Sequence, residues 1–358
     1  MKTYKIASIP GDGVGKELLP IGQKILEEIS AIQGSFKLEF EIFPWGCEYY
    51  LENGCIMPSN GLDILKDFDA IYLGAVGHPD VPDYVASAGL LYTIRQGFNQ
   101  YVNLRPIKML PGVYSPVTTN GEVDITFVRE NTEGEYGDIG GLFKENSTHE
   151  IAIQTNVFSR YGTERIMDYA FKLAEQKKCS VTSVTKSNAL KHSMVFWDKI
   201  FGEIAQKYSN IKTKSVFADA MAMFMISKPE TFDVIVASNL FGDILTDLGS
   251  VLVGGLGFAP GANINPEREF PSMFEPIHGS APDIAGKNIC NPIATIWAGQ
   301  MILEFLGEFE AANRLMKAMS EVCKEGKVKT ADMGGNNSTQ EMGNAILGKI
   351  IDIKEGTI

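Results

Sequence analysis

The 358-residue sequence contains few cysteines, and none of them is arranged as a metal site or a disulfide framework would require. Cys47, Cys55, Cys179, Cys290 and Cys323 are scattered, odd in number and free of any Cys-x-x-Cys spacing. Secreted disulfide scaffolds and structural zinc sites show the opposite pattern. We therefore interpret these cysteines as thiols of a reducing compartment and expect a cytoplasmic protein.

Long apolar runs and an excess of positive charge are also missing. No stretch reaches the roughly 18 apolar residues of a membrane span, and residues 1–10 contain lysines where a signal peptide has an apolar core. The 32 Lys and Arg residues face 44 Asp and Glu residues, and the net charge of -12 argues against a nucleic-acid or membrane-surface partner. With 44% hydrophobic and 21% charged residues, the chain is expected to be globular and to act on a small molecule.

Strand-like apolar runs alternate with helical periodicity along most of the chain, which is typical of an α/β fold. No Gly/Ser-rich or Pro-rich linker and no repeat interrupts the pattern. Residues 142–154 are first polar and then alternating, as in a projecting β-arm. We predict strands at 4–9, 37–43, 69–75, 123–129, 150–157, 181–185 and 233–238, and helices at 16–29, 162–177, 193–208, 294–306 and 311–324.

Two carboxylates follow the predicted strand at residues 233–238. Asp243 and Asp247 are four residues apart, so a helix places them one turn apart on the same face. Like charges at this spacing repel, and a hard cation with oxygen ligands, Mg²⁺ or Mn²⁺, would remove the repulsion. An exposed acidic helix face is the alternative. The position at the carboxyl end of a strand, where α/β proteins bind ligands, favours the metal site.

A glycine-rich turn, with Gly11, Gly13 and Gly15, links the first strand to the first helix. Glycines at such positions allow a tight turn and a close approach of another backbone segment. As a dinucleotide-binding fingerprint the turn fails, because Lys16 occupies the place of the third glycine and no acidic residue ends a second strand at the required distance. We expect it to lie beside a ligand bound elsewhere in the chain.

Three arginines, Arg95, Arg105 and Arg129, lie in stretches that are otherwise poor in charge. A guanidinium group binds a carboxylate through paired hydrogen bonds. Taken singly, each arginine is also typical of a surface ion pair. Together with the two aspartates they indicate a substrate that carries two carboxylates.

Two further segments contain polar residues in positions that favour chemistry. Lys186 follows a strand and can act as a general base when nearby cations favour its neutral form, although an exposed lysine is the plainer interpretation. Residues 274–292 form a polar segment rich in Gly and Pro, in which Asp283 can accept from ribose hydroxyls and His278 can stack or bond. An ordinary connector is the alternative to a ligand-binding loop.

The order and spacing of these segments resemble the metal-dependent β-decarboxylating dehydrogenases, the family of isopropylmalate and isocitrate dehydrogenases. The resemblance covers nearly the whole chain and rests on residues 11–17, 103–106, 129–136, 185–188, 239–247, 278–291 and 330–335. It implies an α/β fold in which two α/β domains share a large mixed sheet, not a dinucleotide Rossmann fold. Residues 1–102 and 256–358 would form a large domain, and residues 103–255 a small central domain with a dimerising β-arm.

The resemblance also implies a homodimer whose active sites take residues from both subunits, and it implies a role for each motif. The base would be Lys186 from the partner subunit and the acid Tyr136, while the substrate carboxylates would be bound by Arg95, Arg105 and Arg129. The metal, Mg²⁺ or Mn²⁺, would be bound by Asp243 and Asp247 with Asp219 from the other subunit. NAD would be bound by Asn188, Glu275, His278, Gly279, Ser280, Ala281, Asp283 and Asn291.

Within the family, residues 44–50, 97–101, 183–188 and 262–268 resemble the branch of tartrate and D-malate dehydrogenases. The expected activity is NAD-dependent oxidative decarboxylation of D-malate to pyruvate and CO₂, with tartrate as a related substrate. Residues 86–95 depart from that branch, and Gln96 replaces its usual second arginine. Leu90 and Leu91 leave 3-isopropylmalate as the alternative substrate, and a binding protein without catalysis is the alternative class. A requirement for K⁺ stays open.

Overall fold

The computed structural model describes residues 1–118 and 121–354, and the chain divides into two compact units. The terminal unit comprises Met1–Gln100, Lys108–Pro116 and Ser250–Ile358, and the central unit comprises Tyr101–Ile107 and Val117–Gly249. The predicted domain boundaries at 102/103 and 255/256 stay a prediction, because compactness does not test which segments fold as domains. In the described ranges no helix is both long and apolar enough to cross a membrane.

The sheet of the terminal unit has the strand order β2-β1-β3-β12-β11. The strands β2, β1, β3 and β12 are parallel, and β11 is antiparallel to β12. Apolar residues alternate between two buried faces, so that Ile9 and Leu73 belong to a different core from Tyr72. The strands are β1 Lys2–Gly11, β2 Phe36–Ile42, β3 Ala70–Ala75, β11 Pro260–Ile264 and β12 Ser272–Pro276.

Four long helices of the terminal unit pack against one another, and two of them, Gly15–Gln33 and Ile293–Leu306, also pack against the sheet. Tyr72 of β3 points to this side and donates a hydrogen bond from its hydroxyl to the carbonyl of Thr295, 2.7 Å away. The helix that contains Thr295 is buried on nearly all sides, which its continuous apolar sequence permits. The four helices are α1 Gly15–Gln33, α10 Ile293–Leu306, α11 Phe309–Glu325 and α12 Thr339–Lys354.

Short helices cover the other face. They enclose a core in which Trp45, Leu65 and Leu90 meet Ile9 and Leu73 of the sheet. One of them, η1, is a π-helix, in which the wider turn accommodates one more residue than an α-helical turn. The short elements on this face are α2 Cys47–Asn53, α3 Gly61–Leu65, α4 Asp83–Ala86, η1 Ser87–Tyr92 and α5 Thr93–Gly97. Two further short helices of the terminal unit are η3 Leu256–Phe258, which contacts the helix Ile293–Leu306, and η4 Ala331–Met333.

The sheet of the central unit has the order β4-β5-β10-β8-β9, and β5, β10, β8 and β9 are parallel. Because these strands are parallel, the residues that follow each of them lie at the same edge of the sheet. The elements are β4 Val102–Lys108, β5 Asp124–Glu130, α6 Arg160–Lys177, β8 Val181–Thr185, α7 Ser193–Ala205, β9 Thr213–Phe217, α8 Ala218–Ser227, η2 Pro229–Thr231, β10 Val234–Ala237 and α9 Asn239–Leu252.

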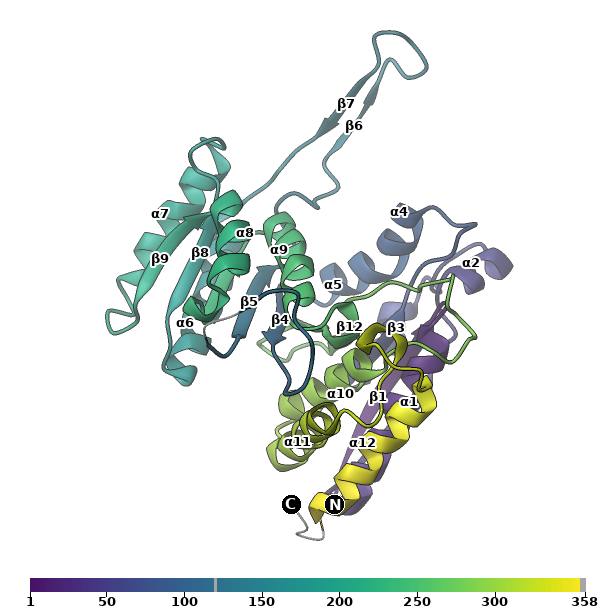
Figure 1. Cartoon of the computed structure of the whole chain (residues 1–358). Helices are drawn as coiled ribbons and strands as arrows, with labels where there is room; N and C mark the ends of the chain where they lie inside the picture. Colours follow the sequence, from purple (N-terminus) through teal and green to yellow (C-terminus); the bar gives the residue numbers. More distant parts are fainter. Residues whose placement is uncertain (119–120, 355–358) are drawn as a thin grey trace. The chain divides into compact units, whose positions relative to one another are not determined.

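A two-stranded antiparallel arm, β6 Gly140–Phe143 and β7 Ile151–Gln154, projects from the central unit (Figure 1). Its apolar side chains are about half exposed: Leu142 55%, Phe143 53%, Ile151 49% and Ile153 48%. A row of exposed apolar side chains on an isolated hairpin is typical of a surface that another chain covers.

The predicted α/β class and the large mixed sheet are confirmed, since the two strand orders given above together make up one mixed sheet of ten strands. Each predicted strand and helix is present, and the strand at 181–185 has the predicted ends. The segment at 274–292 is not a loop throughout, because residues up to Pro276 belong to β12. All five cysteines are free, with Cys55 exposed and Cys47 and Cys323 buried.

Candidate active site

Asp243 and Asp247 lie on α9, which begins directly after the carboxyl end of β10, as predicted. Both carboxylates face Arg105, whose Nη1 is 3.2 Å from Oδ1 of Asp243 and 3.7 Å from Oδ1 of Asp247. The single guanidinium group reaches both aspartates because they are one helical turn apart. Nη1 of Arg105 also donates to Oγ1 of Thr246, 2.7 Å away.

The same carboxylate of Asp243 binds two further side chains. Arg129 is the penultimate residue of β5 and pairs with Ala237, and its Nη1 donates to Oδ1 of Asp243. Its Nε and Nη2 donate to Oδ1 of Asn239 at 3.0 and 2.7 Å. Tyr136 donates from its hydroxyl to Oδ2 of Asp243 at 2.8 Å. Arg105 and Arg129 are both buried, so they belong to the interior and are not surface arginines.

The composition of this cluster fits a hard divalent cation. Its donors are carboxylate oxygens, the ligands that Mg²⁺ and Mn²⁺ prefer. Partial burial and then the neighbouring Asp243 raise the pKa of Asp247, while Arg105 opposes the change. In residues 1–118 and 121–354, however, no three His, Cys, Asp or Glu side chains come close enough to hold a metal ion. The pair of aspartates therefore supplies only part of a ligand set.

Lys186 and Asp219 form a second group in the central unit. They follow β8 and β9, two strands paired through Thr185 and Phe217, and Nζ of Lys186 lies 2.8 Å from Oδ1 of Asp219. The hydrogen bond from Lys186 lowers the pKa of Asp219. Asn188 lies in the turn after Lys186 and is exposed. Since Asp219 does not join Asp243 and Asp247 in a ligand cluster, the residues predicted to bind the metal lie in two separate groups in the described part of one chain.

Arg95 and Glu275 face each other in the terminal unit. Nη2 of Arg95 donates to Oε1 of Glu275 at 2.7 Å, and Nδ2 of Asn263 donates to the same oxygen at 2.7 Å. Both Arg95 and Glu275 are buried. Within the described residues Nε of Arg95 has no hydrogen-bond partner, so the guanidinium group retains a buried donor.

The loop after β12 carries the other predicted cofactor residues. His278 is half-buried, and its Nε2 is buried without a hydrogen-bond partner in the part of the chain that the structure describes. Ser280 and Asn291 are buried, whereas Gly279 and Asp283 are exposed. Ala281 has a φ of 41°, a left-handed conformation that non-glycine residues rarely adopt. A ring nitrogen left without a partner and an exposed carboxylate on the same loop fit a ligand with several polar groups.

The glycine-rich turn supports this loop instead of wrapping a phosphate. The backbone N–H of Val14 donates to the carbonyl of Ser280 at 2.9 Å. A Cβ atom on Gly13 would lie 2.1 Å from that carbonyl oxygen, so only glycine permits the approach. The loop predicted to bind the cofactor therefore lies directly against the glycine-rich turn, and the expected ligand beside the turn stays a prediction.

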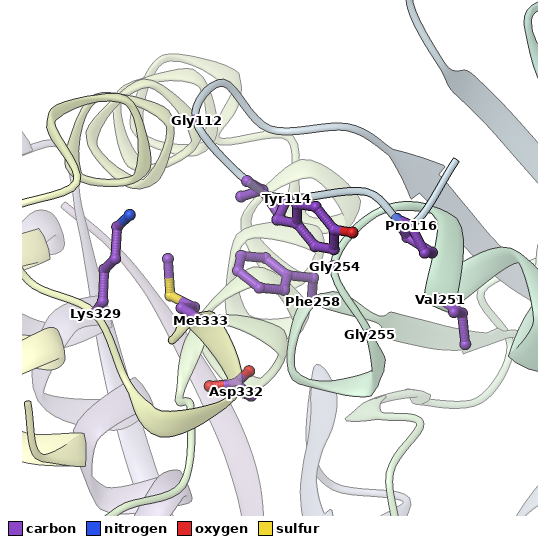
Figure 2. A pocket seen from close by; sticks show the side chains of 11 residues that line it. Gly112, Tyr114, Pro116, Val251, Gly254, Gly255, Phe258, Lys329, Asp332 and Met333 are labelled. Carbon is purple, nitrogen blue, oxygen red and sulfur yellow. The ribbon is translucent and has the colours of Figure 1, made fainter. Parts of the chain in front are cut away.

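A separate pocket of about 270 Å³ opens in the terminal unit (Figure 2). Its walls are mainly apolar, and none of the predicted site residues lines it. Asp332 connects it with the cofactor loop, because Oδ2 of Asp332 accepts a hydrogen bond from Nδ2 of Asn291 at 3.0 Å. The pocket is lined by Gly112, Val113, Tyr114, Pro116, Val251, Gly254, Gly255, Phe258, Lys329, Asp332 and Met333.

The sequence alone did not assign roles to several polar residues that hold the site together. Asn239 and Thr246 bind the arginines, and both lie within one turn of the aspartates on α9. Asp12 is fully buried and accepts from the backbone N–H groups of Cys47, Glu48 and Gly77. A carboxylate inside an apolar, glycine-rich turn is the signal that would have identified Asp12 as a buried anchor.

Curated relatives match this chain over nearly its full length. A D-malate dehydrogenase [decarboxylating] from Escherichia coli (strain K12) is 50% identical over 356 residues, which cover 97% of this chain and 98% of that protein. A probable tartrate dehydrogenase/decarboxylase from Bacillus subtilis (strain 168) is 48% identical over 351 residues, which cover 98% of this chain and 99% of the relative.

Solved structures and family models agree with these relatives. The crystal structure of isocitrate dehydrogenase from Methylococcus capsulatus superposes with a TM-score of 0.88 at 36% sequence identity, covering 97% of this chain and 99% of that chain. The family model described as isocitrate/isopropylmalate dehydrogenase matches residues 5–346. The fold, the groups of site residues and these matches together identify the chain as a member of the isocitrate/isopropylmalate dehydrogenase family.

Proposed function

We propose that this chain is a decarboxylating dehydrogenase that oxidises D-malate to pyruvate and CO₂ with NAD⁺ and a divalent cation, and that it accepts tartrate. The observation that carries the proposal is the convergence of Arg105, Arg129 and Tyr136 on the carboxylate of Asp243. The relatives at 48% and 50% identity, which are named for tartrate and D-malate, support the choice of acid.

The charge of the cluster supports a doubly negative substrate. The guanidinium groups of Arg105 and Arg129 balance the carboxylates of Asp243 and Asp247, so the four side chains sum to zero. A divalent cation on the aspartates would bring the sum to two positive charges. This total matches a dicarboxylate, and we propose that Arg95 contributes to the same recognition.

The proposed chemistry assigns one proton transfer to each of two residues. A bound Mg²⁺ or Mn²⁺ would supply Lewis-acid chemistry at the oxygens of the substrate. Bound NAD⁺ would accept the hydride from C2, and Lys186 takes the proton of the C2 hydroxyl. After CO₂ leaves, Tyr136 returns a proton to C3 through the hydroxyl that it now donates to Asp243.

We propose further that the active protein is a homodimer with shared sites. Lys186 pairs with Asp219, away from the ligand pair of Asp243 and Asp247, as expected if each chain gives the first pair to its partner. The exposed apolar side chains of β6 and β7 supply a surface for a second copy. The five free cysteines fit the proposed cytoplasmic location.

NAD⁺ is the proposed cofactor because Asp283 is an exposed carboxylate on the cofactor loop, followed by the apolar Ile284. A carboxylate accepts from free ribose hydroxyls and repels a 2′-phosphate. We expect kcat/KM for NAD⁺ to exceed that for NADP⁺ by at least about tenfold, equivalent to about 1.4 kcal/mol. Equal values, measured at saturating acid and metal, would mean that a cation such as Lys287 reaches the phosphate.

Steady-state kinetics on D-malate, tartrate, 3-isopropylmalate and isocitrate test the proposed activity. The highest kcat/KM is expected with D-malate. The alternative, 3-isopropylmalate, is favoured only by Leu90 and Leu91, of which Leu90 is fully buried in the core and is not available to a substrate. A higher kcat/KM for 3-isopropylmalate would overturn the choice of acid, and the absence of NADH with all four acids would overturn the reaction class.

A further inference from the structure

The cofactor loop is attached to the first turn of α1 at two points that flank Asp283. At one point the backbone N–H of Val14 donates to the carbonyl of Ser280 at 2.9 Å. At the other, Glu17 accepts from the backbone N–H of Gly286 through Oε1 and from that of Asn288 through Oε2, the latter at 3.0 Å. The arc between Ser280 and Gly286 is therefore fixed at both ends by a single helical turn.

The arc and the residues directly after it contain left-handed backbone conformations. Ala281, Gly286 and Asn288 have φ values of 41°, 76° and 54°. Left-handed conformations of non-glycine residues persist only when neighbouring groups hold them. Within the arc itself, the N–H groups of Ile284 and Ala285 both donate to the carbonyl of Ala281 at 3.1 Å, which makes one tight turn around Asp283.

Within the described residues, Glu17 is the only residue of α1 whose side chain hydrogen-bonds to residues 280–288, and it uses both carboxylate oxygens. Charged acceptors make stronger hydrogen bonds than neutral ones, and two parallel bonds also fix direction. The turn is held on its other side by α12, where the backbone N–H groups of Thr339 and Gln340 bind the carbonyl and Oδ1 of Asn288 at 3.0 and 3.2 Å.

We infer that Glu17 is a positioning residue for the adenosine part of the cofactor. It holds the Gly286–Asn288 turn against α1 and thereby sets the direction of Asp283 before the cofactor arrives. The inference rests on the proposed role of this loop in binding NAD⁺. A loop ordered in advance avoids the loss of conformational entropy on binding, so the effect belongs to cofactor affinity and not to the chemical step.

Glu17→Gln tests the inference, because glutamine keeps the length of the side chain but offers one acceptor oxygen and turns an N–H₂ group toward a backbone donor. Glu28→Gln is the matched control, since Glu28 lies on the same helix and is exposed. Titration calorimetry with ADP, which carries the adenosine ribose, is expected to show a Kd about tenfold higher for Glu17→Gln than for the wild type. The Kd of the control is expected to equal that of the wild type.

Kinetics and hydrogen exchange separate positioning from general damage. The KM for NAD⁺ is expected to rise about tenfold, with kcat within about twofold of the wild type and an unchanged KM for the acid. In the protein without nucleotide, the amides of Gly286 and Asn288 should exchange faster, while Tm stays that of the control.

A double-mutant cycle with Asp283→Asn tests whether Glu17 acts through Asp283. If it does, Glu17→Gln adds little to the loss of ADP affinity in the Asp283→Asn background, whereas fully additive losses would overturn the inference. Unchanged ADP binding in Glu17→Gln would overturn it as well. Failure of the wild-type protein to bind ADP would overturn the cofactor assignment of the loop and this inference with it, and inactivity toward every acid with intact ADP binding would affect the proposed reaction alone.

Discussion

Asp243 is the residue on which most of the site depends, because Arg105, Arg129 and Tyr136 all contact its carboxylate. In the described chain these groups occupy the oxygens that a divalent cation would use. Cation binding must therefore displace or rearrange at least one of these contacts. Because the cation competes with two guanidinium groups for the carboxylate, we expect cation affinity to depend on the charge of Asp243 more than on its shape.

Asp243→Asn keeps the shape and removes the charge. We expect affinity for Mn²⁺ to fall at least about tenfold and turnover to fall with it. Calorimetric titration with Mn²⁺ and the rise of Tm on adding Mn²⁺ measure the effect independently of activity. Asp63→Asn, at an exposed aspartate on α3, is the control, and retained Mn²⁺ affinity in Asp243→Asn would mean that the aspartates are only a polar helix face.

His278 gives the protein a pH dependence of stability with a defined sign. Burial lowers the pKa of its imidazole below the usual value of 6.5. The unfolded chain then binds the proton more readily than the folded chain, so stability is full above about pH 6.5 and is lost as the pH falls through the lowered pKa. Urea unfolding between pH 5 and 8 should show a smaller loss on acidification for His278→Gln than for the wild type, and parallel curves would contradict this.

At the scale of the element, the π-helix η1 keeps a buried stripe aligned along the segment that leads to Arg95. Ala86, Leu90, Ile94 and Phe98 are all buried at intervals of four residues. In a regular α-helix positions four apart advance by about 40° around the axis, so such a stripe turns away from a flat core. A wider turn rotates in the opposite sense and offsets the advance. Oγ1 of Thr93 bonds to the carbonyl of Ala88, five residues back, at 2.7 Å.

Substitutions in η1 test this register. Leu90→Ala removes a fully buried side chain and is expected to cost about 2–5 kcal/mol of unfolding free energy. Leu91→Ala, at a partly buried position one residue later, is expected to cost roughly half as much or less. Urea unfolding measures both, and equal losses would show that the wide turn does not select Leu90 for the core.

Elements with strong periodicity could be predicted from the sequence, and those shaped by tertiary contacts could not. β8 is rich in β-branched residues and α10 carries a long apolar run, and their ends agree with the prediction to within one residue. β12 contains Glu275 and Pro276 among its five buried residues, and both residue types are uncommon in strands. The sequence therefore did not predict a strand there. α12 was missed because Gly343 and Gly348 lower its helix propensity.

At the scale of the molecule, the sequence could predict which residues are candidates for the site, but not which side chains contact one another. The helical spacing of Asp243 and Asp247 is local and can be read directly from the sequence. The partners of Arg95 and Arg129, Glu275 and Asn239, lie 180 and 110 residues away along the chain, and no local pattern encodes such contacts. The role of Glu17 depends likewise on a loop 269 residues later.

The proposed sharing of sites between subunits predicts complementation between inactive variants. Lys186→Met and Asp243→Asn should each abolish nearly all activity as homodimers. A heterodimer of the two, isolated with two different tags, has one site with an intact Lys186 and an intact Asp243, and should recover about half of the wild-type activity. If every site were built from one chain, both sites of the heterodimer would carry a lesion and activity would stay at the level of the homodimers.

The division of the terminal unit between both ends of the chain has a consequence for biosynthesis. β3 pairs with β12, whose first residue, Ser272, is translated 197 residues after the last residue of β3, Ala75. At about 5–20 residues per second a ribosome needs roughly 10–40 seconds to cover that distance. During this interval the amino-terminal strands lack β12, so the edge of β3 is unpaired and one face of the sheet is uncovered. The whole central unit is translated in the same interval. Nascent chains stalled before residue 272 are therefore the ones we expect to need a chaperone.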